Sequence, residues 1–124
     1  EDIGGSSHVT VENCEFDTLA SGIINTSTAI ANPNRWVVQN CKFENNTKHI
    51  DMPFTQSYFL NNIMDEATTN IDFSGGAGGN FVLFNQFSNT QADITISDGY
   101  TPGTADVWRN YSTDTAAFTV GVPT

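Results

Sequence analysis

The sequence predicts an all-β chain folded as a right-handed parallel β-helix, a solenoid of about four to five short coils. Three observations lead to this prediction. A strand-like segment that ends in a cysteine or asparagine recurs along the 124 residues. Similar residues stand at fixed distances from that cysteine or asparagine in each copy. Within each copy apolar and polar residues alternate with a period of two, which is typical of strands and not of helices.

The repeat is most easily followed through the position that closes the strand-like segment, which we call the marker column. Its members are separated by 27, 21, 23 and 25 residues. They are Cys14, Cys41, Asn62, Asn85 and Asn110. A second column, nine residues further on, contains Ile23, Ile50, Ile71 and Ile94, with Phe118 one residue early.

The marker column predicts a ladder of buried side chains. Successive coils of a parallel β-helix lie about 4.8 Å apart, so the members of one column stack on each other. A buried asparagine can then pair its amide with the asparagines above and below it. We expect Asn62, Asn85 and Asn110 to form such a ladder, continued by Cys14 and Cys41. The cysteines are predicted to be buried free thiols, because stacked parallel side chains give poor disulfide torsions.

The repeated segments at residues 9–16, 36–43, 58–64 and 81–87 resemble the β-helix repeats of pectate-lyase-like proteins and phage tailspikes. The resemblance covers nearly the whole chain. It implies the fold much more specifically than the activity, because this fold hosts many functions. Among those functions are structural roles in virions and the cleavage of polysaccharides.

We expect one domain over residues 1–124, with coils at about 8–34, 35–56, 57–80, 81–105 and 106–124. The connections that close the coils are rich in Gly, Pro and Asn and should emerge along one edge, where solenoids usually bind. A solenoid needs caps at both ends, and the sequence contains no capping helix. Because the chain also begins at Glu1, we expect a processed or truncated piece, or one with ends covered by partners.

The charge balance narrows the classes of partner. Four basic residues stand against fourteen acidic ones, which gives a formal net charge of −10. This argues against nucleic-acid binding and against an anionic membrane surface. No apolar run reaches transmembrane length, so we expect neither nucleic acid nor membrane as a partner.

Acidic residues flank the second column, and strand alternation predicts that they point outward. On stacked coils this would place His49, Asp51, Asp72 and Asp93 on one strand face. The three carboxylates are candidates for a calcium site, and the resemblance implies that such faces can cleave polysaccharides. The alternative is a merely solvated face. His49 and the three aspartates are also the candidates for catalysis. Because Lys48 borders the patch without clearly facing it, no basic residue is evident there, and none of the four is assigned a catalytic role.

Exposed aromatic residues are the second kind of candidate. Tyr100, in a predicted loop, and Trp108, beside the last marker residue, are candidate ligand contacts that could stack on sugar rings. Trp36 falls at a partly inward position and is predicted to be core. The sequence contains no zinc spacing and no phosphate-binding loop.

Two functions remain open. The first is a non-catalytic virion module, either structural or receptor-binding, of the tailspike, fibre or capsid-decoration type. It would be extracellular or virion-borne, and trimeric or bound to other virion proteins. The alternative is a fragment of a secreted polysaccharide lyase or glycoside hydrolase with a carbohydrate-binding cleft. No cofactor is expected apart from calcium at the carboxylates.

Overall fold

The computed structural model describes residues 7–24, 34–51, 54–73, 79–88, 94–98, 105–108, 110–112 and 118–121. Within these ranges the chain forms strands and bends, and no helix. Every strand pair is parallel. The prediction of an all-β chain with parallel strands is therefore confirmed.

The strands form two sheets. The first sheet has the order β1 (Thr10–Glu12), β4 (Val37–Gln39), β6 (Tyr58–Leu60), β8 (Asn80–Leu83) and β11 (Ala105–Trp108). The second sheet contains β2 (Glu15–Asp17), β3 (Ser21–Ile24), β5 (Lys42–Asp51), β7 (Ile63–Phe73), β9 (Gln86–Ser88), β10 (Ile94–Asp98), β12 (Tyr111–Ser112) and β13 (Phe118–Gly121).

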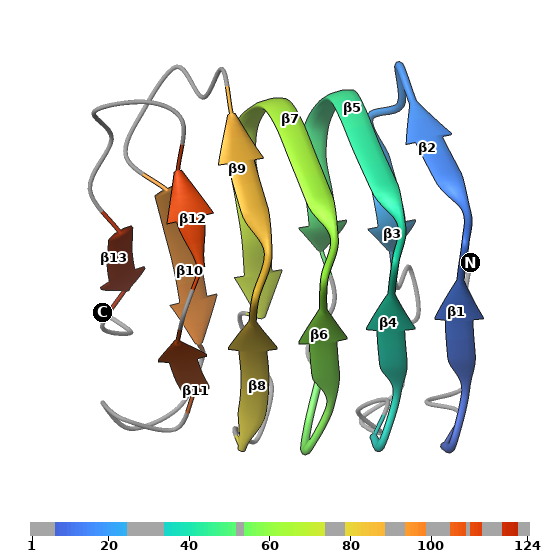
Figure 1. The fold of residues 1–124 in the computed structure, drawn as a ribbon, viewed down its shortest axis with the longest axis vertical. Helices are drawn as coiled ribbons and strands as arrows, with labels where there is room; N and C mark the ends of the chain where they lie inside the picture. The colour runs from blue at the N-terminus through green and yellow to red at the C-terminus, as the bar shows by residue number, and fades with distance from the viewer. Residues whose placement is uncertain are drawn as a thin grey trace.

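The chain alternates between the two sheets, as Figure 1 shows. It rises through β1 and β2 on the near side of the view, turns over, and descends through β3 on the far side. The next circuits follow the same path through β4 and β5 and then through β6 and β7. We call the five predicted coils repeats 1 to 5, and each repeat contributes one strand to the first sheet.

The strand register aligns the marker column in all five repeats. Two residues before the marker, Glu12 is opposite Gln39, Gln39 opposite Leu60, and Leu60 opposite Leu83. The last of these, Leu83, is opposite Trp108. The predicted spacings of 27, 21, 23 and 25 residues are therefore those of the strand pairing.

The second column was predicted wrongly in repeat 4. Ile23, Ile50 and Ile71 are in register, but the partner of Ile71 is Ile96 and not Ile94. Ile94 is instead opposite Phe118. Repeat 4 has two more residues between its marker and this column than repeat 3, so a fixed distance from the marker selects the wrong isoleucine.

In repeats 1 to 4 the chain turns at bends whose backbone is left-handed. The φ angles at these bends lie between 50° and 75°. Side chains rarely adopt this conformation, and asparagine tolerates it best after glycine. The register groups the bends into three columns: His8, Arg35, Gln56 and Gly79; Asn13, Asn40, Asn61 and Phe84; and Thr18, Asn45 and Glu66.

The core lies between the two sheets. Phe43, Phe54, Phe59 and Phe87 are fully buried in it, together with Met64 and the two column isoleucines of repeats 2 and 3. The rings of Phe16 and Phe43 stack in parallel, with centroids 4.8 Å apart. Apolar burial of this kind contributes about 25 cal/mol per Å² and is the main force that holds the repeats together.

Candidate functional site

The asparagines of the marker column are linked by hydrogen bonds. Oδ1 of Asn85 accepts from the backbone N–H of Asn62 at 2.9 Å and from its Nδ2 at 3.0 Å. Asn110 accepts from Asn85 in the same way, at 2.8 and 3.0 Å. Each amide also donates to a carbonyl of the preceding repeat, such as that of Val38 or Phe59. This column therefore satisfies polar groups inside an apolar core.

The cysteines at the beginning of the column differ from each other. Both are free thiols, and each donates to the carbonyl oxygen two residues earlier at 3.3 Å. Cys41 is buried, which raises the pKa of its thiol, but Cys14 is exposed. The prediction of two buried thiols is therefore wrong for Cys14, because the described residues include no earlier repeat that would cover it.

Two further polar columns were not predicted, and they follow the other two bends. In one, Trp36 donates its N–H to Oγ of Ser57 at 3.1 Å, and Ser57 donates its N–H to Oδ1 of Asn80 at 3.2 Å. In the other, Leu19 donates its N–H to Oδ1 of Asn46 at 2.9 Å. The signal was present in the sequence: Asn46 and Asn80 directly follow the bend residues Asn45 and Gly79, as Asn62 follows Asn61.

The predicted acidic face is only partly formed. His49 is not on it, because its side chain is fully buried, as is that of Ile50. The alternation breaks between these two adjacent residues of β5, and it breaks at the same place on β7, where Asn70 and Ile71 are both buried. Asp93 lies outside the described residues, and the register places Ser97 opposite Asp72.

Asp51 and Asp72 do lie side by side, and a lysine joins them. The two aspartates are opposite each other on β5 and β7. Nζ of Lys48 is 3.2 Å from a carboxylate oxygen of each. The expectation that no basic residue faces the patch is therefore wrong. Burial lowers the pKa of Lys48, but hydrogen bonds to Asp51 and Asp72 outweigh it and raise that pKa above its ordinary value.

The two predicted aromatic contacts, Tyr100 and Trp108, remain predictions, and the described residues expose a different aromatic pair. Tyr100 lies outside the described residues, Trp108 is placed in β11 opposite Leu83, and Trp36 is buried against Phe54. Instead, Tyr58 and Phe81 stand on the outer face of the first sheet. Both residues come four positions before a marker, next to an inward-pointing residue, so alternation could have identified them as outward.

Tyr58 and Phe81 form a stacked pair. They are opposite each other on β6 and β8, and their rings are nearly parallel, with centroids 4.8 Å apart. Tyr58 remains 41% exposed. Together with Arg35, Gln56 and Gly79 they line a hollow of about 510 Å³. Aromatic rings beside a few polar groups are typical of small-molecule sites.

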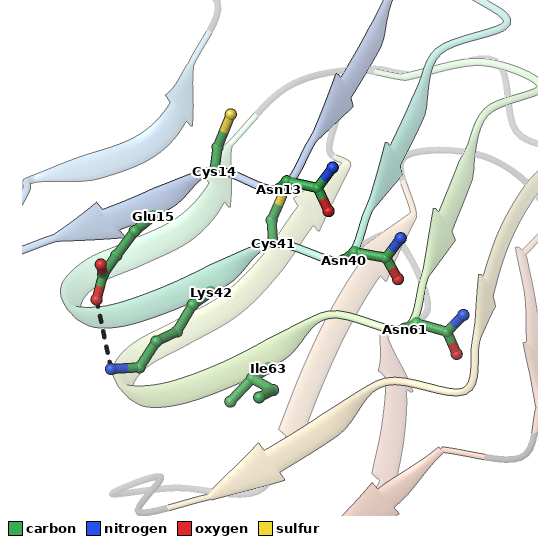
Figure 2. Close-up of a pocket in the computed structure, with 8 residues that line it drawn as sticks. All are labelled: Asn13, Cys14, Glu15, Asn40, Cys41, Lys42, Asn61 and Ile63. Carbon is green, nitrogen blue, oxygen red and sulfur yellow. Dashed lines mark hydrogen bonds and ion pairs between the residues drawn. The ribbon is translucent and has the colours of Figure 1, made fainter.

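A second hollow, of about 490 Å³, follows the corner between the two sheets. In Figure 2 the bend residues Asn13, Asn40 and Asn61 project their amides in one direction, while Lys42 reaches towards Glu15. Nζ of Lys42 is 3.4 Å from Oε1 of Glu15. The asparagines are explained by the left-handed backbone alone, so this groove gives no independent sign of a ligand.

Other site types find no support in the described part of the chain. No three His, Cys, Asp or Glu side chains are grouped there as metal ligands would be. The described residues also contain no helix long and apolar enough to cross a membrane. Comparison of the sequence and structure with protein-family models, curated proteins and solved structures finds no match.

Proposed function

We propose that the chain is a right-handed parallel β-helix that serves as a non-catalytic virion module, structural or receptor-binding, and contacts a glycan. The register that carries each repeat onto the next supports the solenoid, as do the three bend columns. Connections between parallel strands of one sheet are right-handed in nearly all proteins, which supports the hand. We further propose an extracellular or virion location, with a homotrimer or other virion proteins as the assembly.

The observation that carries the binding role is the Tyr58–Phe81 pair. The two rings are parallel and stacked face to face on the outer sheet face, and together they form a continuous apolar surface against which a sugar ring can pack. Arg35 and Gln56 stand beside it and can donate hydrogen bonds to hydroxyl groups.

The charge of this face favours a neutral glycan. The outward positions of β4, β6 and β8 are uncharged: Val37, Gln39, Tyr58, Leu60, Phe81 and Leu83. The chain as a whole carries a formal net charge of −10, which repels polyanions. A neutral sugar chain is not repelled by this net charge, and it needs no charged partner at the outward positions of these strands.

The enzymatic alternative has one observation in its favour, which is the cluster of Lys48, Asp51 and Asp72. A lyase needs carboxylates and a basic residue to take up the proton. A base must, however, be unprotonated near neutral pH. Pairing with the two aspartates raises the pKa of Lys48 and keeps it protonated. We therefore prefer the non-catalytic function.

The test is a titration of the ¹⁵N-labelled chain with a panel of neutral oligosaccharides, followed by NMR. We expect shifts confined to β6, β8 and their neighbours. Tyr58→Ser and Phe81→Ser should each weaken binding at least about tenfold, or about 1.4 kcal/mol. The matched control is Ile63→Ser, because Ile63 is 42% exposed but lies in the corner groove.

Several outcomes would overturn the proposal. Absence of binding across the panel, or an equal loss in the Ile63 variant, would remove the glycan site. Unsaturated products or new reducing ends from acidic polysaccharides, with or without calcium, would establish the enzyme instead. A stable monomer in size exclusion with light scattering would contradict the trimer.

A further inference from the structure

Asn46 of repeat 2 forms hydrogen bonds to the backbone of repeat 1. These bonds determine which way its side-chain amide is oriented. Oδ1 accepts from the N–H of Leu19, and Nδ2 donates to the carbonyl oxygen of Phe16, both at 2.9 Å. A flipped amide would place donor against donor and acceptor against acceptor. The second hydrogen of Nδ2 remains, and Nδ1 of His49 lies 3.1 Å from that nitrogen.

This arrangement selects one form of His49. Nδ1 must accept from Asn46, so the ring is neutral and carries its proton on Nε2. Nε2 of His49 and Oδ1 of Asn70 are both buried without a hydrogen-bond partner among the described residues. His49 and Asn70 are neighbours across the β5–β7 pair, because Lys48 is opposite Thr69 and Ile50 is opposite Ile71. A donor and an acceptor thus stand on adjacent repeats.

Strand β3 of repeat 1 packs tightly against His49 and its neighbour Phe43. A Cβ atom added to Gly22 of β3 would lie 2.7 Å from the carbonyl oxygen of His49 and 2.9 Å from Cδ1 of Phe43. The ring of Phe43 also packs against the imidazole, with centroids 5.7 Å apart. The side chain of His49 is fully buried. The imidazole therefore cannot turn away or gain water unless β3 moves.

We propose that His49 and Asn46 form an acid-operated latch that holds repeat 1 on repeat 2. A proton taken from solvent by Nδ1 would place an N–H of His49 against an N–H of Asn46. The amide could respond only by turning, which breaks its bonds to Leu19 and Phe16. Protonation of His49 therefore opposes the docking of repeat 1, and docking opposes protonation.

The charged residues around His49 and Asn46 do not prevent protonation from releasing repeat 1. Asp65 of β7 acts on His49 and favours the proton, but burial is the larger effect and holds the pKa of His49 at about 4. Strand β3 carries no charged residue. The other charged residues of β2, β5 and β7 are exposed or partly exposed: Glu15, Asp17, Lys42, Glu44, Lys48, Asp51, Glu66 and Asp72.

The test is amide hydrogen exchange of the full chain between pH 7 and pH 4, corrected for the intrinsic pH dependence. The amides to follow are those that join repeats 1 and 2: Thr18, Leu19, Thr47 and Lys48. We expect their opening constant to rise about tenfold per pH unit between about pH 6 and the folded pKa of about 4. The amides of Tyr58, Ile63 and Gln86, which join later repeats, should change less.

The matched variant is His49→Gln, which keeps an acceptor for Asn46 but does not titrate. In this variant, the amides that join repeats 1 and 2 should lose the pH dependence of their opening constant. An equal pH dependence in the variant, or an equal rise at all amides of the parent, would overturn the latch. Should the variant fail to fold, ¹⁵N ring shifts of the parent decide: a proton on Nδ1 at pH 7 would refute the proposal.

Discussion

The side-chain oxygen of Asn85 accepts two hydrogen bonds from Asn62, one from its backbone N–H at 2.9 Å and one from Nδ2 at 3.0 Å. The side chains of both residues are 1% exposed, so water cannot replace either bond. Each buried polar group that loses its hydrogen-bond partner lowers the stability of the fold by about 1–3 kcal/mol.

We therefore expect Asn85→Leu to lower the free energy of unfolding by roughly 2–4 kcal/mol. The measurement is urea denaturation, with the exposed neighbour Gln86→Leu as the control. A loss of the same small size in both variants would mean that the column does not act as a ladder.

The buried imidazole predicts a pH dependence of stability. Burial lowers the pKa of His49 to about 4, from an ordinary value of 6.5. Below pH 6.5 His49 binds a proton in the unfolded chain but not in the folded chain. The free energy of unfolding must therefore fall as the pH falls from 6.5 to about 4. The loss from this group amounts to about 3 kcal/mol at most.

Denaturation of the parent and of His49→Gln at several pH values measures this contribution. Carboxylates contribute equally to both proteins, so the difference between the two curves belongs to His49. Superimposable curves would contradict a neutral buried histidine.

Lys48 holds two aspartates that would otherwise repel each other. We expect Lys48→Met to lower the free energy of unfolding by roughly 0.5–1.5 kcal/mol, a modest value because all three side chains are partly exposed. Salt should recover part of the loss. The double variant Lys48→Met/Asp72→Asn should recover most of it.

Asp51 and Asp72 also provide a test of the predicted calcium site. In the parent, Lys48 already supplies the positive charge, so calcium should raise the melting temperature no more than sodium chloride of equal ionic strength. In Lys48→Met a calcium-specific gain should appear. A specific gain in the parent would show that calcium binds there despite the lysine.

Phe84 occupies a bend where the three preceding repeats have asparagine. Its φ is 59°, and its ring is 46% exposed. A bulky residue in this conformation is strained, and strain of this kind often marks a functional surface. We expect Phe84→Asn to raise the free energy of unfolding by roughly 0.5–1 kcal/mol and to weaken the assembly or ligand binding. A loss of stability would show that the ring is retained for packing.

The sequence predicted the strand class, the parallel stacking and the register through the marker column, because these follow from residues that repeat at each turn. It did not predict the position of His49. That position depends on a break in the alternation, with the adjacent residues His49 and Ile50 both buried, inside a segment that reads as one regular strand.

The Lys48 ion pairs and the Tyr58–Phe81 stack were missed for a different reason. The Lys48–Asp51 pair lies within β5, whereas the Lys48–Asp72 pair and the stack join neighbouring repeats. All three depend on which long outward side chains meet, and residue spacing alone does not determine that. The wrong partner for Ile71 came from two additional residues in repeat 4, which no fixed spacing can anticipate.

The register also determines how the chain can fold. Among the described residues, every strand pair joins positions between 21 and 27 residues apart, so each new repeat closes a loop of nearly constant length and entropy. Within the described part of the chain, the longest pairing joins β5 and β7, which are also the longest strands and pair at seven positions. We expect this pair to nucleate folding, and the remaining repeats to add to it one at a time in both directions along the stack.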